Sequence, residues 1–210
     1  MSTRIRRSVC GVNVYLVLSR SRTVLSRTIA LATRDEFTHA SLALDPGLEL
    51  MFSFARRRAN NPFVGCFKRE RLDDGLYRGM DVVPGLVLEI PVTPEQHAVV
   101  CARISEFLLD SHAYSYKKTG LVSVLTGRGS EDDTRFVCSE FVYHVLHGAG
   151  VCDLGVARWQ VRPQMLLDLP GEVVFRGDLK EYAARHRPGL RGVASAPALT
   201  FAPTPARALA

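Results

Sequence analysis

The sequence of 210 residues contains no hydrophobic run that approaches the length of a membrane-spanning helix, which needs about 20 apolar residues. The apolar stretch at 9–18 follows a basic start. It is short, however, Asn13 interrupts it, and it lacks a small-residue cleavage pattern before the polar residues that come next. The stretch therefore predicts the first strand of the fold and not a secretory signal.

The sequence also lacks any Cys-x-x-Cys pair. Its five cysteines are odd in number and widely spread: Cys10, Cys66, Cys101, Cys138 and Cys152. A zinc ribbon requires closely spaced pairs, and a disulfide framework normally requires an even number of cysteines, so both are disfavoured. Free thiols are typical of a reducing compartment, and we expect a cytoplasmic protein.

The usual signals for nucleic-acid and nucleotide binding are missing as well. The formal net charge is only +6, and the basic clusters at 1–7, 56–58 and 185–191 have no interleaved aromatic residues on which bases could stack. The glycines at 127–129 lack the lysine and the serine or threonine of a phosphate-binding loop. We expect no nucleic-acid partner, and the basic N-terminus is only a weak indication of membrane association.

The composition, with 47% hydrophobic and 23% charged residues, is that of a globular protein with a sizeable core. We expect one domain at 1–187. From 188 onward the composition shifts to alanine, proline, glycine and threonine, so 188–210 is predicted to be a disordered Ala/Pro-rich tail. Strands and helices are both predicted but do not alternate strictly, which favours the α+β class.

Local patterns predict the individual elements. Thr93 is a suitable N-cap, with Pro94 at the first helical position, for a helix that ends near Leu109. The segment 45–47, Asp-Pro-Gly, is typical of a hairpin turn, and a loop is expected at 60–62. The predicted strands are 11–18, 38–44, 48–55, 66–71, 87–91 and 172–176, and the predicted helices are 23–33, 94–109, 116–125, 138–149 and 164–169.

Cys138 opens the strongest helical signal of the chain. The apolar face of this helix comprises Cys138, Phe141, Val142, Val145, Leu146 and Ala149. Unpaired backbone N–H groups and the helix dipole favour a thiolate at a helix start, and the N–H groups of Cys138 and Ser139 could donate to an oxyanion. The competing interpretation is a buried structural cysteine, because free cysteine packs as a small hydrophobic residue.

His39 is the candidate base for this thiol. If 45–47 is a three-residue loop, Leu44 pairs with Leu48, and His39 lies opposite Ser53 on the next strand. A polar group opposite an imidazole can fix its tautomer and direct its other nitrogen at a thiol. This register therefore predicts Ser53 as the residue that orients His39.

The order of the short motifs is also informative. They are Tyr15, Thr38-His39-Ala40-Ser41, Phe52-Ser53-Phe54, Asn61-Pro62-Phe63, Tyr114-Ser115-Tyr116 and Phe136-Val137-Cys138-Ser139-Glu140-Phe141-Val142. In this order, with a histidine on a strand well before a Cys-Ser pair that opens a helix, the chain resembles the permuted branch of the NlpC-type papain-like superfamily. That branch includes YiiX-like proteins and, more distantly, lecithin:retinol acyltransferase-like enzymes. The resemblance spans about residues 10–180.

The resemblance implies a papain-like α+β fold in which an antiparallel sheet packs against helices. It also implies that Cys138 is the nucleophile, that His39 is the base, and that a third polar residue follows on the strand after the histidine. The matching position is near Ser53, with Glu49 as a less favoured substitute.

Two further groups of residues could carry chemistry. Glu140, His144 and His147 are spaced i, i+4 and i+7 on the polar side of the helix that Cys138 opens, where they could bind a divalent metal. We favour a solvated face, and we expect neither a metal nor a cofactor. Tyr114 and Tyr116 could line the cleft and donate to an oxyanion, or they could be packing residues.

These features predict a cysteine-dependent hydrolase that cleaves an amide through a thioacyl intermediate. The substrate would contain an amide or an ester, as a peptide, a cell-wall peptide or a lipid does. Two alternatives stay open: a lipid acyl hydrolase or acyltransferase that uses the same two residues, and a binding module that retains the fold without turnover.

Overall fold

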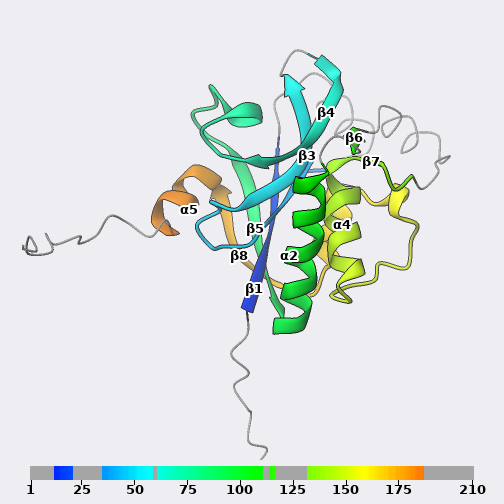
Figure 1. The fold of residues 1–210 in the computed structure, drawn as a ribbon. Coiled ribbons are helices and arrows are strands. Elements are labelled where there is room, and N and C mark those ends of the chain that lie inside the picture. Colours follow the sequence, from blue (N-terminus) through cyan, green and yellow to red (C-terminus); the bar gives the residue numbers. More distant parts are fainter. Residues whose placement is uncertain (1–11, 21–34, 59–60, 111–113, 117–131, 187–210) are drawn as a thin grey trace, which may run out of the picture.

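The computed structural model describes residues 12–20, 35–58, 61–110, 114–116 and 132–186, which Figure 1 draws in colour. The predicted helix at 23–33, most of the predicted helix at 116–125 and the predicted tail lie outside these residues. Within them, no helix has both the length and the apolar character that crossing a membrane requires.

A six-stranded sheet forms the centre of the fold, and every pair of neighbouring strands in it is antiparallel. The strand order is β4-β3-β2-β1-β5-β8, so the strand that begins at His39 is an interior one. The strands are β1 (Val12–Ser19), β2 (His39–Ala43), β3 (Met51–Arg58), β4 (Asn61–Glu70), β5 (Pro84–Val92) and β8 (Glu172–Asp178). A separate parallel pair consists of β6 (Ser115–Tyr116) and β7 (Arg135–Phe136).

The helices complete an α+β fold, as the sequence predicted. They are α2 (Pro94–Leu109), α4 (Cys138–Gly148) and α5 (Leu179–His186), with short 3-10 helices η1 (Gly75–Tyr77), η2 (Arg158–Gln160) and η3 (Pro163–Asp168). α2 has the predicted start, because the Thr93 hydroxyl accepts from the Gln96 N–H at 3.1 Å. The helix predicted at 164–169 is the 3-10 helix η3, the loop predicted at 60–62 belongs partly to β4, and α5 was not predicted.

The two faces of the sheet carry separate cores. Alternate residues of β1 show this, since Leu16 and Leu18 belong to one buried cluster whereas Tyr15 and Val17 belong to the other. The first cluster includes the apolar faces of α2 and α4, which lie side by side against the sheet in Figure 1. The second cluster includes Leu179 and neighbouring residues of α5.

The predicted register of the β2–β3 hairpin was wrong by two residues. Ala43 pairs with Met51, and the Leu44 N–H donates to the Leu50 carbonyl at 3.1 Å, so Leu44 does not pair with Leu48. The cause is the Asp45 carboxylate, which accepts from the backbone N–H groups of residues 49 and 50 and closes a longer loop. A shift of two residues keeps the alternation of faces, and therefore the hydrophobic pattern could not reveal it.

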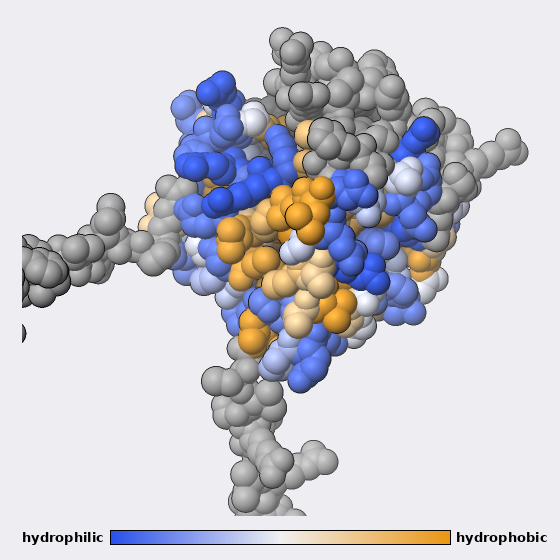
Figure 2. All heavy atoms as spheres, viewed as in Figure 1, coloured by the Kyte–Doolittle hydropathy of each residue, from blue (hydrophilic) through white to orange (hydrophobic). Residues whose placement is uncertain are grey.

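Apolar side chains also gather on the surface around α2, on the face that Figure 2 shows. The exposed large apolar residues of this helix are Val99, Leu108 and Leu109, and Leu109 at its last position is 87% exposed. The end of α2 lies next to β7, because the ring of Phe107 contacts that of Phe136 with centroids 5.2 Å apart. Phe136 precedes Cys138 by two positions, so this apolar surface is close to the start of α4.

Candidate active site

Cys138 is the first residue of α4, and it is a free, partly exposed cysteine. The N-cap of α4 is Val137, whose side chain makes no capping hydrogen bond, in contrast to Thr93 at the start of α2. The Glu140 carboxylate reaches back and accepts from the Val137 N–H at 3.3 Å. The next N–H groups, those of Cys138 and Ser139, therefore point out of a helix start that has no capping side chain, which suits an acceptor atom of a ligand.

His39 begins β2, and its ring is only 5% exposed. Its Nε2 atom lies 2.8 Å from Oε2 of Glu70, the last residue of β4, which is 3% exposed. A histidine and a carboxylate that are 31 positions apart in the sequence thus form a buried pair. Glu70 takes the position of the orienting residue beside His39.

The two residues predicted for that position lie elsewhere. Ser53 is fully buried, and its hydroxyl donates to the Ala40 carbonyl at 2.7 Å, so it supports the pairing of β2 with β3. Glu49 lies within the loop that Asp45 closes and is 3.7 Å from the Arg69 guanidinium in a partly exposed ion pair.

Sequence reasoning missed Glu70 although the strand that ends with it was predicted. The sequence offered one signal for Glu70. Alternation along β4 puts Glu70 on the same face as Lys68, and a carboxylate that points into a sheet core needs a partner. The sequence did not show the order of the strands in the sheet, which decides what that partner is. Glu70 pairs with Met51, and Met51 pairs with Ala43, so two ladders separate Glu70 from the strand of His39.

The electrostatics of the buried pair favour the charged forms. Burial is the largest single influence on His39 and opposes its protonation, but the charge and hydrogen bond of the Glu70 carboxylate and the neighbouring Cys138 side chain all favour the protonated ring. Together they raise the pKa of His39 to about 10. Burial would raise the pKa of Glu70, yet the His39 imidazolium and the hydrogen bonds of the carboxylate hold this pKa below its ordinary value. At neutral pH the pair is therefore an imidazolium and a carboxylate, with Cys138 close enough to the ring to influence its pKa.

The other predicted cleft residues have mixed positions. Ser139 is 2% exposed, and its hydroxyl donates to the Val161 carbonyl at 2.6 Å, which fixes the first turn of α4. Tyr114 packs its ring against Phe107 with centroids 4.4 Å apart, in agreement with the packing interpretation. Tyr116 lies in β6 and pairs with Phe136, and its side chain is outside the described part of the chain.

The prediction that Glu140 lies on a solvated face of α4 is wrong, because Glu140 is 1% exposed. His147 is exposed, as predicted. His144 lies between two guanidinium groups, with Nδ1 at 3.2 Å from Arg158 and Nε2 at 3.4 Å from Arg103. Burial and these two cations lower the pKa of His144 to about 4. Among the described residues, no group of three His, Cys, Asp or Glu side chains is arranged to hold a metal ion.

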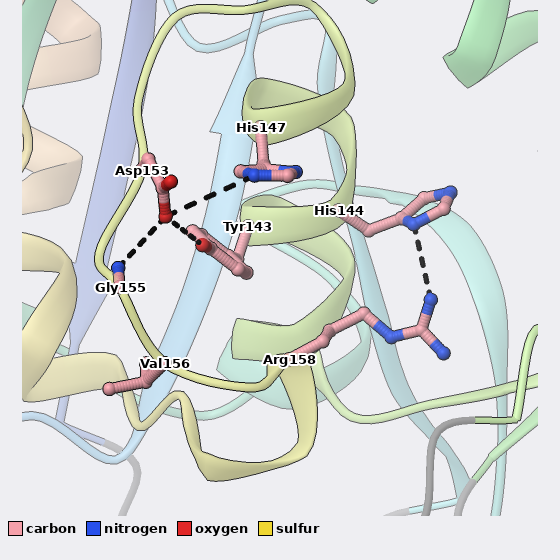
Figure 3. Close-up of a pocket in the computed structure, with 7 residues that line it drawn as sticks. All are labelled: Tyr143, His144, His147, Asp153, Gly155, Val156 and Arg158. Atoms are coloured by element: carbon pink, nitrogen blue, oxygen red, sulfur yellow. Dashed lines mark hydrogen bonds and ion pairs between the residues drawn. The ribbon is translucent and has the colours of Figure 1, made fainter.

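A hollow lies beside α4, away from Cys138, His39 and Glu70, and Figure 3 shows its lining residues. It has a volume of about 370 Å³ and includes Tyr143, His147 and Asp153, in addition to His144 and Arg158. The Asp153 carboxylate accepts from the Tyr143 hydroxyl at 3.1 Å and lies 4.0 Å from the His147 ring. These polar groups are already bonded to one another, and none belongs to the set formed by Cys138, His39 and Glu70.

The site therefore joins the start of α4 to the ends of two strands of the sheet. Comparison of the chain with models of protein families, with curated proteins and with solved structures found no match.

Proposed function

We propose that the chain is a cysteine-dependent hydrolase of the permuted NlpC-type papain-like kind, which cleaves an amide through a thioacyl intermediate. One observation carries this proposal: a partly exposed cysteine at an uncapped helix start lies beside a buried histidine that is ion-paired to a carboxylate. This combination supplies a nucleophile, a proton donor and a group that orients the donor.

The fold supports the same assignment. A helix that opens with Cys138 packs against an antiparallel sheet whose interior strand opens with His39, and the histidine precedes the cysteine in the chain. This order agrees with the permuted branch that the motifs resemble.

The proposed reaction begins with the thiolate. Its sulfur attacks the carbonyl carbon of the substrate, a C–S bond forms, and the carbonyl oxygen becomes an oxyanion that accepts from the N–H groups of Cys138 and Ser139. The intermediate collapses when the imidazolium of His39 gives its proton to the leaving nitrogen and the C–N bond breaks. Since Nε2 is bound to Glu70, Nδ1 is the ring nitrogen that transfers this proton.

The second half of the reaction releases the acyl group. A water molecule loses a proton to the now neutral His39 and attacks the thioester carbon, and the C–S bond breaks to give a carboxylic acid. The thiolate and the imidazolium are thereby restored. Throughout, the Glu70 carboxylate keeps the proton on Nε2 and stabilises the charged ring.

Labelling by thiol-directed acyl probes tests the proposal. The full chain is treated at neutral pH with an electrophilic peptide ketone, and the labelled residue is located by mass spectrometry. We expect Cys138→Ala to abolish labelling and His39→Ala to slow it about 100-fold or more. Equal labelling of the wild type and His39→Ala would contradict the proposed pairing.

Cys101 offers a matched control. It is also partly exposed, and its sulfur lies 3.7 Å from the Nδ1 atom of His97 on the same helix, but burial raises the pKa of its thiol. Cys101→Ala should label at the wild-type rate. Labelling of Cys138 without release of product from any amide or ester substrate would favour a binding module instead.

The exposed apolar surface at the end of α2 favours a second candidate, a lipid acyl hydrolase or acyltransferase. Leu108 and Leu109 are 48% and 87% exposed at the end of α2, which contacts the strand just before α4 through the rings of Phe107 and Phe136. If the substrate is a lipid, the double variant Leu108→Ser, Leu109→Ser should label more slowly with a fatty-acyl probe and at an unchanged rate with the peptide probe. If the double variant labels at the wild-type rate with both probes, this candidate is contradicted.

A further inference from the structure

A row of buried hydroxyl groups lies behind His39. Ser19, Ser41 and Tyr77 are 0%, 0% and 1% exposed, and they come from β1, β2 and η1 respectively. Ser41 Oγ lies 2.6 Å from Glu70 Oε2 and 3.3 Å from His39 Nε2. The Tyr77 hydroxyl lies 3.0 Å from Ser19 Oγ.

The charge of Glu70 fixes the direction of its hydrogen bond with Ser41. An ionised carboxylate only accepts, so the single hydroxyl proton of Ser41 goes to Glu70. Burial and the nearby Glu70 charge keep the pKa of Tyr77 well above its ordinary value, so its hydroxyl stays protonated and adds no second negative charge beside the carboxylate.

The ionised state and position of the Glu70 carboxylate depend on Ser41, because the hydrogen bonds of the carboxylate are concentrated on one oxygen atom. Both His39 and Ser41 contact Oε2, whereas Oε1 is buried and has no hydrogen-bond partner among the described residues. Without Ser41, His39 would be the only described hydrogen-bond donor to the carboxylate. A buried carboxylate that loses a donor is more easily protonated or turned.

We propose that Ser41 is a positioning residue, whose hydroxyl donates to Glu70 and holds the carboxylate against His39. The Tyr77 ring also restricts the histidine, since the two rings make an edge contact with centroids 6.4 Å apart. This inference rests on the proposed function, because it assigns the residues that prepare His39 for the reaction.

The direct test measures the titration of Glu70 by ¹³C NMR of the full chain labelled at glutamate side-chain carboxyls. The Glu70 signal is identified by its absence from Glu70→Gln. We expect Ser41→Ala to move this titration to higher pH and to slow labelling of Cys138 about 10-fold, the size of effect typical of a residue that orients another functional group. Ser41→Thr, which keeps the hydroxyl, should restore the wild-type titration.

Ser53→Ala is the matched control. It removes an equally buried serine hydroxyl from the neighbouring strand, but that hydroxyl donates to a backbone carbonyl and not to Glu70. A purely structural role of Ser41 predicts lower stability in both alanine variants and the same Glu70 titration as in the wild type, and that result would overturn the inference. If Ser41→Ala does not fold, Ser41→Cys is measured in its place, because a thiol is a weaker donor than a hydroxyl, and an unchanged titration there overturns the inference equally.

The NMR readout separates this inference from the proposed function. If Cys138 labels equally fast in the wild type and in Glu70→Gln while Ser41→Ala shifts the Glu70 titration, the role of Ser41 is supported and the hydrolase proposal fails. If Glu70→Gln loses labelling and Ser41→Ala leaves both labelling and titration unchanged, only the role of Ser41 fails.

Discussion

His39 and His144 are both shielded from solvent, yet their pKa values are shifted in opposite directions. Burial disfavours the charged form of both rings, yet the pKa of His39 is raised to about 10 and that of His144 is lowered to about 4. The difference comes from the neighbours. His39 is bound to the Glu70 carboxylate, whereas His144 lies between the guanidinium groups of Arg158 and Arg103.

This contrast shows that burial alone does not identify a reactive histidine. At neutral pH, His39 carries a proton that it can donate, and Cys138 lies within its reach. His144 is neutral, and its ring packs against Phe136 with centroids 5.2 Å apart. The sign of the adjacent charge therefore decides which of the two rings is suited to acid–base chemistry.

The largest expected effect comes from removing the charge that distinguishes the two sites. Glu70→Gln leaves a buried histidine without its counter-ion, so we expect a loss of about 3 kcal/mol in the free energy of unfolding at pH 7 and a fall in the pKa of His39. Urea denaturation and NMR of the ring measure these changes. Glu49→Gln, at a partly exposed carboxylate, should cost less than about 1 kcal/mol. An equal loss in both variants would break the comparison.

A pH series sharpens the same contrast. The folded pKa of His39 lies above its unfolded value of 6.5, so its stabilisation is complete below pH 6.5 and disappears as the pH rises through about 10. The folded pKa of Glu70 is lowered from 4.5, so its contribution is present above pH 4.5 and is lost in acid. The difference in unfolding free energy between the wild type and Glu70→Gln should therefore be large near pH 6 and shrink toward pH 10. A constant difference over that range would contradict the assignment.

The effect of His144 on stability should have the opposite pH dependence to that of His39. Its folded pKa of about 4 lies below the unfolded value of 6.5, so the unfolded chain binds the extra proton and stability falls as the pH drops from 6.5 to 4. In His144→Gln this slope should flatten. Unfolding curves at several pH values measure it, and an unchanged slope would show that another group titrates there.

The smallest expected effect concerns one of the two cations. Arg103→Met removes the guanidinium that lies 3.4 Å from Nε2 of His144, and the pKa of that ring should rise part of the way toward 6.5. The ring signals followed by NMR across pH give the value. Because Arg158 remains at 3.2 Å, the rise should be incomplete, and no rise would mean that Arg103 does not contribute to this pKa.

The sequence allowed prediction of those features that depend on near neighbours. Thr93 and Pro94 predicted the start of α2, and the spacing of apolar residues predicted that α4 begins at Cys138. The hairpin register depended on the Asp45 side chain, which binds N–H groups four and five positions later and lengthens the loop without changing the alternation. Glu70 depended on the strand order across two ladders, which no local pattern contains.

The valine at the start of α4 has a consequence for how ligands act on the whole molecule. The side chain of Val137 cannot accept from the N–H groups that follow it, so the native state is less stable there than a helix with a serine or aspartate cap would be. An anion or carbonyl that binds these groups supplies the missing acceptor only in the folded chain, and by linkage it raises the melting temperature. A thermal-shift screen of small carboxylates and peptide aldehydes can therefore find ligands of this site before a substrate is known.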